Sequence, residues 1–231
     1  IKQRLAAEFQ SAPLRHLLLD YDGTLVPFAK HPSEAVPDER LLKLLSKLGS
    51  DSRTDLTIIS GRSHLTLQQW FHDIPANLVA EHGAAIRLAD GIWKNDYAEE
   101  LNWKPLIRPT LDLFAHRSPG SFVEEKNHTL AWHYRNVDPD LGFVRSRELL
   151  DNLYHLVRNA QLQVIDGNKV IEVRVAGIDK GAAARKLILE KPYSFILAIG
   201  DDKTDEDMFR VLEHKAVTIK VGGGHTLAQY T

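Results

Sequence analysis

Residues 17–24 read Leu-Leu-Leu-Asp-Tyr-Asp-Gly-Thr, so a short apolar run stops at two aspartates spaced two residues apart. A run of this kind, without polar alternation, is typical of a strand buried on both faces of a parallel sheet. In open α/β sheets, ligands bind beyond the carboxyl ends of the strands. The segment therefore predicts a buried strand that carries Asp20 and Asp22 to the ligand-binding edge of an α/β sheet.

The regions on either side of this segment alternate between strand and helix. Apolar runs at 56–59 and 78–80 predict two more buried strands, and leucines at helical spacing between Pro37 and Gly49 predict a helix before them. After residue 177 the pattern returns, with helices and strands predicted at 180–189, 195–199, 205–212 and 217–221. This alternation indicates an α/β protein with a parallel sheet wrapped by helices.

A different pattern fills the middle of the chain. Alternating segments and helices are predicted there at 105–116, 121–126, 129–135, 139–159, 162–165 and 170–175. Helices beside alternating antiparallel strands indicate an open-faced α+β unit. We therefore expect an α/β core formed by 1–103 and 178–231, split in the sequence by an inserted α+β unit at 104–177.

The composition argues against several classes of protein. Hydrophobic residues make up 43% of the chain and charged residues 26%, which is ordinary for a folded globular protein. With 29 Lys and Arg against 31 Asp and Glu, the chain lacks the basic excess of a general nucleic-acid binder. No apolar stretch approaches the ~20 residues that span a membrane. We expect a protein that binds a small molecule and neither nucleic acid nor membrane.

The chain contains no cysteine, which excludes disulfides and thiolate metal ligands. This composition is compatible with a reducing compartment, and we expect a cytoplasmic protein. The first residue is Ile1 rather than Met. We therefore expect a processed chain or a piece of a longer polypeptide.

Two groups of carboxylates follow predicted buried strands. Asp20 and Asp22 would repel each other unless a cation lies beside them, and Mg²⁺ prefers such oxygen ligands. The second group, Gly-Asp-Asp-Lys-Thr-Asp at 200–205, also follows an apolar run, so a parallel sheet brings Asp201 to the same edge. The alternatives are a plain Asp-Gly turn for the first group and a solvated helix start for the second.

Two further segments suit an anionic phosphate. Ser60-Gly61-Arg62 lies between a strand end and the next helix, where a hydroxyl and free backbone N–H groups can form a phosphate cradle. Lys180, at the start of a later helix, can supply a point positive charge. The simpler interpretations are helix capping by a serine and an ordinary solvated lysine.

These segments, in this order, resemble the haloacid dehalogenase (HAD) phosphatase superfamily: Asp-x-Asp-Gly-Thr from Asp20, then Ser60, Lys180, and Gly-Asp-Asp-x-x-Asp ending at Asp205. The resemblance covers essentially the whole chain. It implies a Rossmann-like HAD core with a parallel sheet and an inserted α+β cap. It also implies that Asp20 is the nucleophile that forms an aspartyl-phosphate, with Asp22 as general acid and then general base.

The same resemblance implies the ligands of the metal and of the phosphoryl group. Mg²⁺ would be held by Asp20, the Asp22 carbonyl and Asp201, with Asp205 in support. The transferring phosphoryl group would be bound by Ser60, Gly61 and Lys180. Positive charge from the metal and the lysine would offset the repulsion between an anionic nucleophile and an anionic ester.

Three segments narrow the resemblance to trehalose-phosphate phosphatases: Glu-Glu-Lys at 124–126 with His-Tyr-Arg at 133–135, Val-Ile-Glu-Val-Arg at 170–174, and Ala-Glu-His-Gly at 80–83. The match implies that trehalose 6-phosphate is hydrolysed to trehalose and phosphate. The residues that would bind the substrate are then Glu124, Lys126, Glu172, Arg62 and His133.

The spacing of Glu124 and Lys126 is compatible with a shared ligand. Two residues apart on a strand, their side chains point to the same face, and carboxylates and an ammonium can each bond several hydroxyls. The alternative is a surface ion pair, which would contribute ~0–1 kcal/mol.

Other functions stay open from the residues alone. A related HAD phosphatase could act on sucrose phosphate or a mannosylglycerate phosphate, and a phosphomutase would share the chemistry of Asp20. A non-catalytic phosphosugar sensor could keep the fold, but it needs neither a nucleophile nor a general acid. The chain contains no glycosyltransferase domain, and the partner that we consider is a trehalose-phosphate synthase domain or subunit.

Overall fold

A computed structural model describes residues 2–29, 31–89, 91–95, 101–158 and 160–231, and the chain divides into two units. The first unit combines Ile1–Asn95 with Asp179–Thr231, and the second is Asp96–Ile178. The sequence predicts an insertion at 104–177. In the structure the second unit begins eight residues earlier, at Asp96, and ends one residue later, at Ile178. The first unit is thus assembled from two segments that are distant in the sequence.

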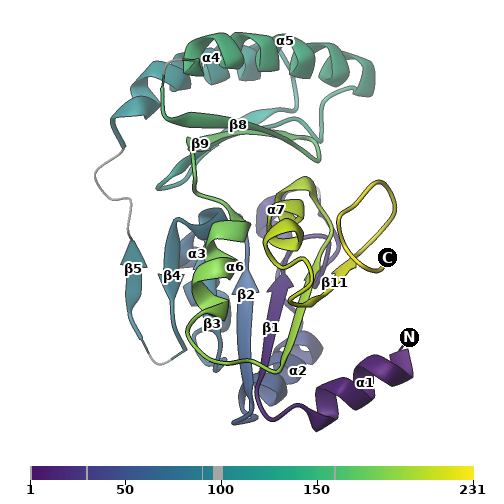
Figure 1. Ribbon diagram of the computed structural model, residues 1–231. Helices are drawn as coiled ribbons and strands as arrows, with labels where there is room; N and C mark the ends of the chain where they lie inside the picture. The colour runs from purple at the N-terminus through teal and green to yellow at the C-terminus, as the bar shows by residue number, and fades with distance from the viewer. Residues whose placement is uncertain (1, 30, 90, 96–100, 159) are drawn as a thin grey trace. The chain divides into compact units, whose positions relative to one another are not determined.

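A seven-stranded sheet in the order β11-β10-β1-β2-β3-β4-β5 forms the centre of the first unit (Figure 1). Its strands are β1 (Arg15–Asp20), β2 (Thr54–Ile59), β3 (Asn77–Ala80), β4 (Ala85–Arg87), β5 (Trp93–Asn95), β10 (Phe195–Gly200) and β11 (Val217–Lys220). The pairs from β11 to β3 are parallel, whereas β4 and β5 add antiparallel at one edge. The predicted α/β fold with a parallel-rich sheet is confirmed.

The register of β1 with its two neighbours determines which residues meet at the carboxyl edge. Every residue of β1 is buried, as its apolar run predicts. Asp20 pairs with Ile59 of β2, and Leu19 pairs with Ile199 of β10. The segments that follow β1, β2 and β10 therefore leave the sheet at the same edge.

Helices cover both faces of this sheet (Figure 1). α2 (Glu39–Gly49) and α3 (His64–Phe71) pack on one face, and α6 (Lys180–Ile188) and α7 (Lys203–Val211) pack on the other. Each of these helices begins after a residue whose side chain accepts a hydrogen bond from a backbone N–H in the first turn; the four residues are Asp38, Ser63, Asp179 and Asp202. α7 begins at Lys203 rather than at the expected Asp205, because Asp202 and Asp205 form a capping box around its first turn.

One helix is not among those that the sequence predicts. α1 (Lys2–Ser11) has no buried residue, and its mixed polar sequence carries no broad apolar stripe. It is attached through Phe9, whose ring contacts the Phe195 ring edge-on at 5.8 Å between centroids. A helix that packs through so few side chains leaves little periodic signal in its sequence.

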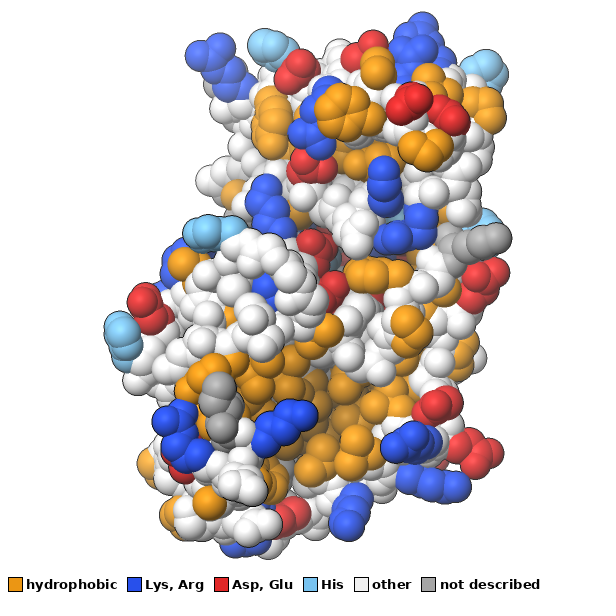
Figure 2. Space-filling model, turned by 90° about the vertical axis from the view of Figure 1, so that its right-hand side faces the viewer, with side chains coloured by type: hydrophobic (Ala, Val, Ile, Leu, Met, Phe, Trp, Pro, Cys, Tyr) orange, Lys and Arg blue, Asp and Glu red, His pale blue; other side chains and the backbone are white. Residues whose placement is uncertain are grey.

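The sheet is covered less completely at its β10–β11 edge than at β2 and β3. Leu197, Ile199 and Val217 are only partly buried, although their neighbours in the same layer are core residues. Figure 2 shows a broad area of hydrophobic side chains on one face of the first unit.

The second unit is a four-stranded antiparallel sheet with two helices on one face (Figure 1). The strands, in the order β6-β7-β9-β8, are β6 (Phe122–Glu125), β7 (Thr129–His133), β8 (Leu162–Gly167) and β9 (Val170–Val175). α4 (Lys104–His116) and α5 (Pro139–Val157) pack against Leu130, Trp132, Ile171 and Val173. This is the open-faced α+β arrangement that the alternating segments predict.

The register of this sheet brings acidic residues together on its other face. Glu124 of β6 pairs with Ala131 of β7, and Ala131 pairs with Glu172 of β9. Glu125 points to the opposite side, where it bonds Lys104 and Arg108 of α4. In neither unit does a described helix have the length and apolar character needed to cross a membrane.

Candidate active site

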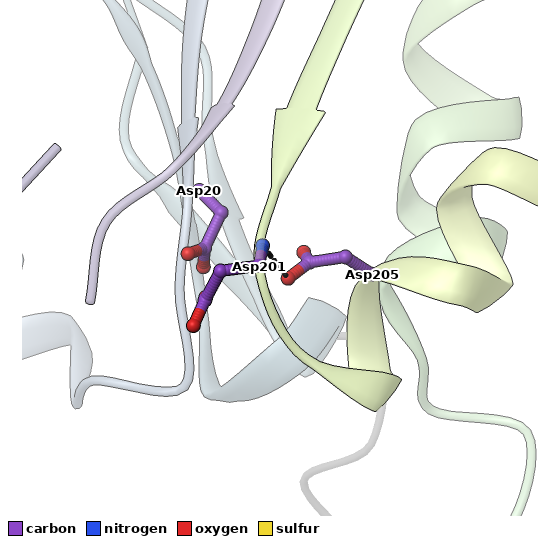
Figure 3. Close-up of side chains that lie close together, drawn as sticks. All are labelled: Asp20, Asp201 and Asp205. Carbon is purple, nitrogen blue, oxygen red and sulfur yellow. Dashed lines mark hydrogen bonds between the residues drawn. The ribbon is translucent and has the colours of Figure 1, made fainter. Parts of the chain in front are cut away.

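Three aspartates meet at the carboxyl edge of the first unit's sheet. Asp20 ends β1, Asp201 follows β10, and Asp205 lies in the first turn of α7 (Figure 3). One oxygen of each carboxylate lies within 4.8 Å of one from each of the others. The expectation that Asp20 and Asp201 reach one edge therefore agrees with the geometry of the folded chain.

Lys180 lies between two of these carboxylates. Its Nζ donates hydrogen bonds to Asp20 Oδ1 at 2.6 Å and to Asp205 Oδ1 at 2.8 Å. The residue is only 2% exposed, so the ammonium is held away from water. Asp179 caps the helix that begins at Lys180, and this cap sets the direction from which the side chain enters the site. The simpler interpretation of a solvated lysine is therefore wrong.

The site carries more negative than positive charge. Burial, followed by the charge of Asp205, raises the pKa of Asp20 well above its usual range and that of Asp201 to about 6. Burial alone would lower the pKa of Lys180, but the charges and hydrogen bonds of Asp20 and Asp205 together raise it. One ammonium among three carboxylates leaves room for a further cation.

The free oxygens of the cluster fit Mg²⁺. Within the described part of the chain, Asp20 Oδ2 and Asp201 Oδ1 are buried oxygens without a hydrogen-bond partner. Both oxygens of Asp205 already accept hydrogen bonds, Oδ1 from Lys180 and Oδ2 from the backbone N–H groups of Asp201 and Asp202. Two unsatisfied carboxylate oxygens in one cluster suit a hard cation, whereas Asp205 is better placed to hold the loop.

Gly23 is enclosed by the same cluster. Its φ of 86° lies in the left-handed region, and a Cβ at this position would lie 2.1 Å from Asp201 Oδ2. Both the backbone conformation and the space therefore require glycine here. The close approach joins the turn after β1 to the loop after β10.

We expect Gly23→Ala to displace Asp201 and so weaken both metal binding and turnover. The matched control is Gly222→Ala, because Gly222 also has a φ of 86° but a Cβ added there would meet nothing within 4 Å. Both variants should lose about 1 kcal/mol of folding free energy through backbone strain. Only Gly23→Ala should show a lower affinity for Mg²⁺, measured by calorimetric titration. Equal Mg²⁺ affinities in the two variants would contradict the enclosure of Asp201 by Gly23.

The loop Ser60-Gly61-Arg62 connects β2 to α3 and is held by hydrogen bonds of its own. Ser60 Oγ accepts the Arg62 backbone N–H at 3.1 Å. The backbone N–H groups of Glu81 and His82 donate to the carbonyls of Arg62 and Ser60, at 3.0 and 2.9 Å. Glu81 and His82 have φ values of 46° and 59°, an uncommon conformation for residues other than glycine. The strained turn after β3 thus supports the candidate phosphate loop.

Two supporting features were missed by reasoning from the sequence. The bonding role of the Glu81–His82 turn could not be read from its spacing. Lys220, at the end of β11, donates from Nζ to the Asp201 carbonyl at 2.7 Å and lies 3.5 Å from Glu206 Oε1. Its position at a strand end was the available signal, because charged residues there reach the same edge as the aspartate cluster.

Asp22 and Arg62 form an ion pair at this edge. Arg62 Nε donates to Asp22 Oδ2 at 2.8 Å, and Arg62 Nη2 donates to Asp22 Oδ1 at 2.6 Å. The resemblance implies that Arg62 contacts a substrate, whereas in the folded chain its guanidinium binds the candidate general acid.

In the second unit, the four expected substrate-binding residues of the cap lie together. Lys126 Nζ is 3.6 Å from Glu124 Oε2 and 3.8 Å from Glu172 Oε1. His133 Nε2 lies 2.8 Å from Glu124 Oε2. Burial opposes ionisation of Glu124, but the hydrogen bond from His133 and the charge of Lys126 lower its pKa to about 2. The side chain of Lys126 is only 8% exposed, so this group is not the plain surface ion pair considered as the alternative.

Comparison with known proteins gives a consistent result over almost the whole chain. A family model described as Trehalose-phosphatase matches residues 18–227. The bifunctional trehalose-6-phosphate synthase/phosphatase of Thermoproteus tenax is 43% identical over 227 residues, which is 98% of this chain and 31% of that protein. The chain spans only 25 to 31% of the length of the first curated relatives that it matches.

Solved structures agree on the fold. The C-terminal domain of Candida albicans trehalose-6-phosphate phosphatase superposes with a TM-score of 0.94 at 30% identity, covering 98% of this chain and 90% of that one. A haloacid dehalogenase-like hydrolase from Bacillus subtilis superposes with a TM-score of 0.57 at 16% identity, covering 88% of each chain. The second likeness concerns the fold alone, and with the first it confirms the HAD architecture.

Proposed function

The chain belongs to the trehalose-phosphatase family, and from this premise we propose that it hydrolyses trehalose 6-phosphate to trehalose and inorganic phosphate. The observation that carries the proposal is the buried cluster of Asp20, Lys180, Asp201 and Asp205 at the carboxyl edge of the sheet. Buried charges at such an edge are costly for stability, which makes a catalytic role the better explanation of their presence.

The metal site that we propose holds Mg²⁺ through the free oxygens of Asp20 and Asp201 and through the Asp22 carbonyl, with Asp205 in support. When bound, the ion supplies positive charge that reduces repulsion between the nucleophile and the phosphate ester. Asp205 keeps the loop in place through the N–H groups of Asp201 and Asp202. Lys220 adds a second restraint through the Asp201 carbonyl.

The reaction that we propose has two displacements at phosphorus. In the first, a carboxylate oxygen of Asp20 forms a bond to phosphorus as the bond to the sugar oxygen breaks, and Asp22 gives its proton to that oxygen. In the second, Asp22 takes a proton from water, whose oxygen displaces Asp20 and releases phosphate. Lys180, with Ser60 and Gly61, holds the non-bridging oxygens while charge develops on them.

Sugar recognition is proposed for the acidic face of the second unit. Glu124 and Glu172 can each accept hydrogen bonds from two hydroxyls, and Lys126 can donate to others. His133 orients Glu124 through the bond at 2.8 Å. A set of charged groups that are mostly buried favours a polyol that satisfies them and disfavours a ligand that leaves them unpaired.

The test is phosphate release from a panel of sugar phosphates with Mg²⁺ and with EDTA. We expect preference for trehalose 6-phosphate, lost in EDTA. Glu124→Gln and Glu172→Gln should each raise KM for it by about tenfold to a hundredfold, since each leaves a hydroxyl poorly bonded. Glu125→Gln is the control, because Glu125 lies beside Glu124 but faces α4.

Each other outcome selects a different function. Preference for sucrose phosphate or a mannosylglycerate phosphate, with the same metal dependence, would keep the chemistry and reject the substrate. Transfer to a second sugar hydroxyl would indicate a phosphomutase. Tight binding of a phosphosugar without release of phosphate would indicate a sensor. A trehalose-phosphate synthase domain or subunit is the partner that we propose, since the Thermoproteus tenax relative is named as a synthase/phosphatase.

A further inference from the structure

The ion pair between Arg62 and Asp22 uses both prongs of the guanidinium. Arg62 Nε and Nη2 donate to the two oxygens of one carboxylate, at 2.8 and 2.6 Å. The Arg62 side chain is 11% exposed and that of Asp22 is 28% exposed, so the pair lies partly out of water. A two-pronged pair fixes the plane of the carboxylate as well as its distance, which a single hydrogen bond does not do.

Arg62 is itself held on several sides. Its backbone N–H donates to Ser60 Oγ, and its carbonyl accepts the Glu81 N–H. Its Nη1 donates to the Pro32 carbonyl, and its guanidinium lies 5.0 Å from the centre of the Trp70 ring. The arginine is therefore a fixed element of the β2–α3 loop.

Asp22 depends on Arg62 for the orientation of its carboxylate. Its backbone is set by the short bridge with Val26 and by the Gly23 N–H, which donates to the Val26 carbonyl at 2.7 Å. Among the described residues, the hydrogen bonds that the Asp22 carboxylate accepts come from Arg62. Without the guanidinium, the side chain would be free to rotate among its staggered positions.

We infer that Arg62 is a positioning residue that orients Asp22 for proton transfer, and not a ligand of the substrate. The inference rests on the proposed function, because it needs Asp22 to give a proton to the leaving oxygen as the bond from Asp20 to phosphorus forms. In that step one Asp22 oxygen carries the proton, and the other keeps its hydrogen bond from Arg62. One tripeptide then serves two purposes: Ser60 contributes to the phosphate loop, and Arg62 aligns the acid. General acid catalysis depends on placing the donor within hydrogen-bond reach of the departing oxygen.

The inference predicts a dependence on the leaving group. A sugar alkoxide is a poor leaving group and needs the proton, whereas p-nitrophenolate leaves as a stable anion and does not. The ratio kcat/KM reports the first displacement, in which Asp22 acts as acid. Loss of Arg62 should therefore lower kcat/KM for a sugar phosphate and leave kcat/KM for p-nitrophenyl phosphate nearly unchanged.

The experiment compares Arg62→Met and Arg62→Lys with the unsubstituted chain, using trehalose 6-phosphate and p-nitrophenyl phosphate with Mg²⁺. Arg62→Met should lower kcat/KM for the sugar phosphate about 10²-fold or more, and Arg62→Lys should lose less but not recover fully, because an ammonium has no fork. In an Asp22→Asn background, Arg62→Met should add almost nothing. Arg108→Met is the control, since Arg108 also bonds both oxygens of an aspartate, Asp112, but through Nε alone and in the second unit.

Three results would overturn the inference. An equal loss with both esters would indicate that Arg62 binds the phosphoryl group or supports the fold. An undiminished loss in the Asp22→Asn background would indicate direct contact with substrate. No loss with either ester would mean that the pair between Arg62 and Asp22 does not contribute to proton transfer. By contrast, the absence of metal-dependent release from either ester by the unsubstituted chain would overturn the proposed function together with this inference.

Discussion

Asp20→Asn is expected to abolish metal-dependent phosphate release, with kcat reduced about 10⁴-fold or more. The amide cannot form the acyl phosphate, so the covalent route is closed. It also replaces one of the two free carboxylate oxygens that suit Mg²⁺. The measurement is phosphate release from trehalose 6-phosphate at saturating substrate. A residual rate within tenfold of the unsubstituted chain would reject Asp20 as the nucleophile.

The same variant separates chemistry from folding. Burial and Asp205 raise the pKa of Asp20, which means that its ionised form is costly in the folded chain. Replacing it by asparagine removes that cost while Lys180 keeps its bond to Asp205. In EDTA, we expect Asp20→Asn to melt at the same temperature as the unsubstituted chain or higher. Asp207→Asn, on the partly exposed side of α7 where Asp207 bonds Arg210, should change neither property.

Lys180→Met is expected to damage both stability and activity. It leaves Asp20 and Asp205 buried without the ammonium that bridges them at 2.6 and 2.8 Å. Breaking a buried ion pair by removing one partner costs about 3–5 kcal/mol, and we expect a loss of that size in chemical unfolding with EDTA present. Turnover should fall about 10²-fold to 10³-fold, because the charge that stabilises the transferring phosphoryl group is gone.

Lys191→Met is the matched control for stability. Lys191 also bonds an aspartate at 2.7 Å, but its side chain is 51% exposed, and the loss should be about 0–1 kcal/mol.

The effect at Lys180 should also depend on pH. A carboxyl whose folded pKa lies above its unfolded value of 3.8 contributes stability that is present at low pH and lost as pH rises. The deficit of Lys180→Met should therefore shrink as the pH falls from neutral toward 3.8, because the unpaired carboxyls take up protons. A deficit that is independent of pH would contradict an electrostatic origin.

The order of the elements could be predicted because their signals are local. The apolar run at Leu17–Leu19 lies within the buried strand β1, and the leucines after Pro37 lie within α2. The alternating segments of the second unit became its four strands, since alternation follows directly from one buried face. α1 was missed because it is tied to the sheet through Phe9 and has no buried residue to mark its inner side.

The acidic edge could be predicted in part. Strand ends at Asp20, Ser60 and Asp201 were visible in the sequence, and a parallel sheet can only bring them to one edge. The partners of these residues were not visible. Nothing in the spacing of Arg62 distinguishes a contact with substrate from the pair with Asp22. The strand end at Lys220 indicates that its side chain reaches this edge, but not that it bonds the Asp201 carbonyl.

The fold class could thus be predicted from the sequence alone, because burial patterns and strand ends are local features. Tertiary structure decided how the charges at the acidic edge are shared: Lys180 between Asp20 and Asp205, Asp205 as the support of its own loop, and Arg62 with Asp22. The physical reason is the range of the interactions involved. Burial patterns repeat every two or 3.6 residues along the chain, whereas Lys180 and Asp20 are 160 residues apart and meet only when the two halves of the sheet join.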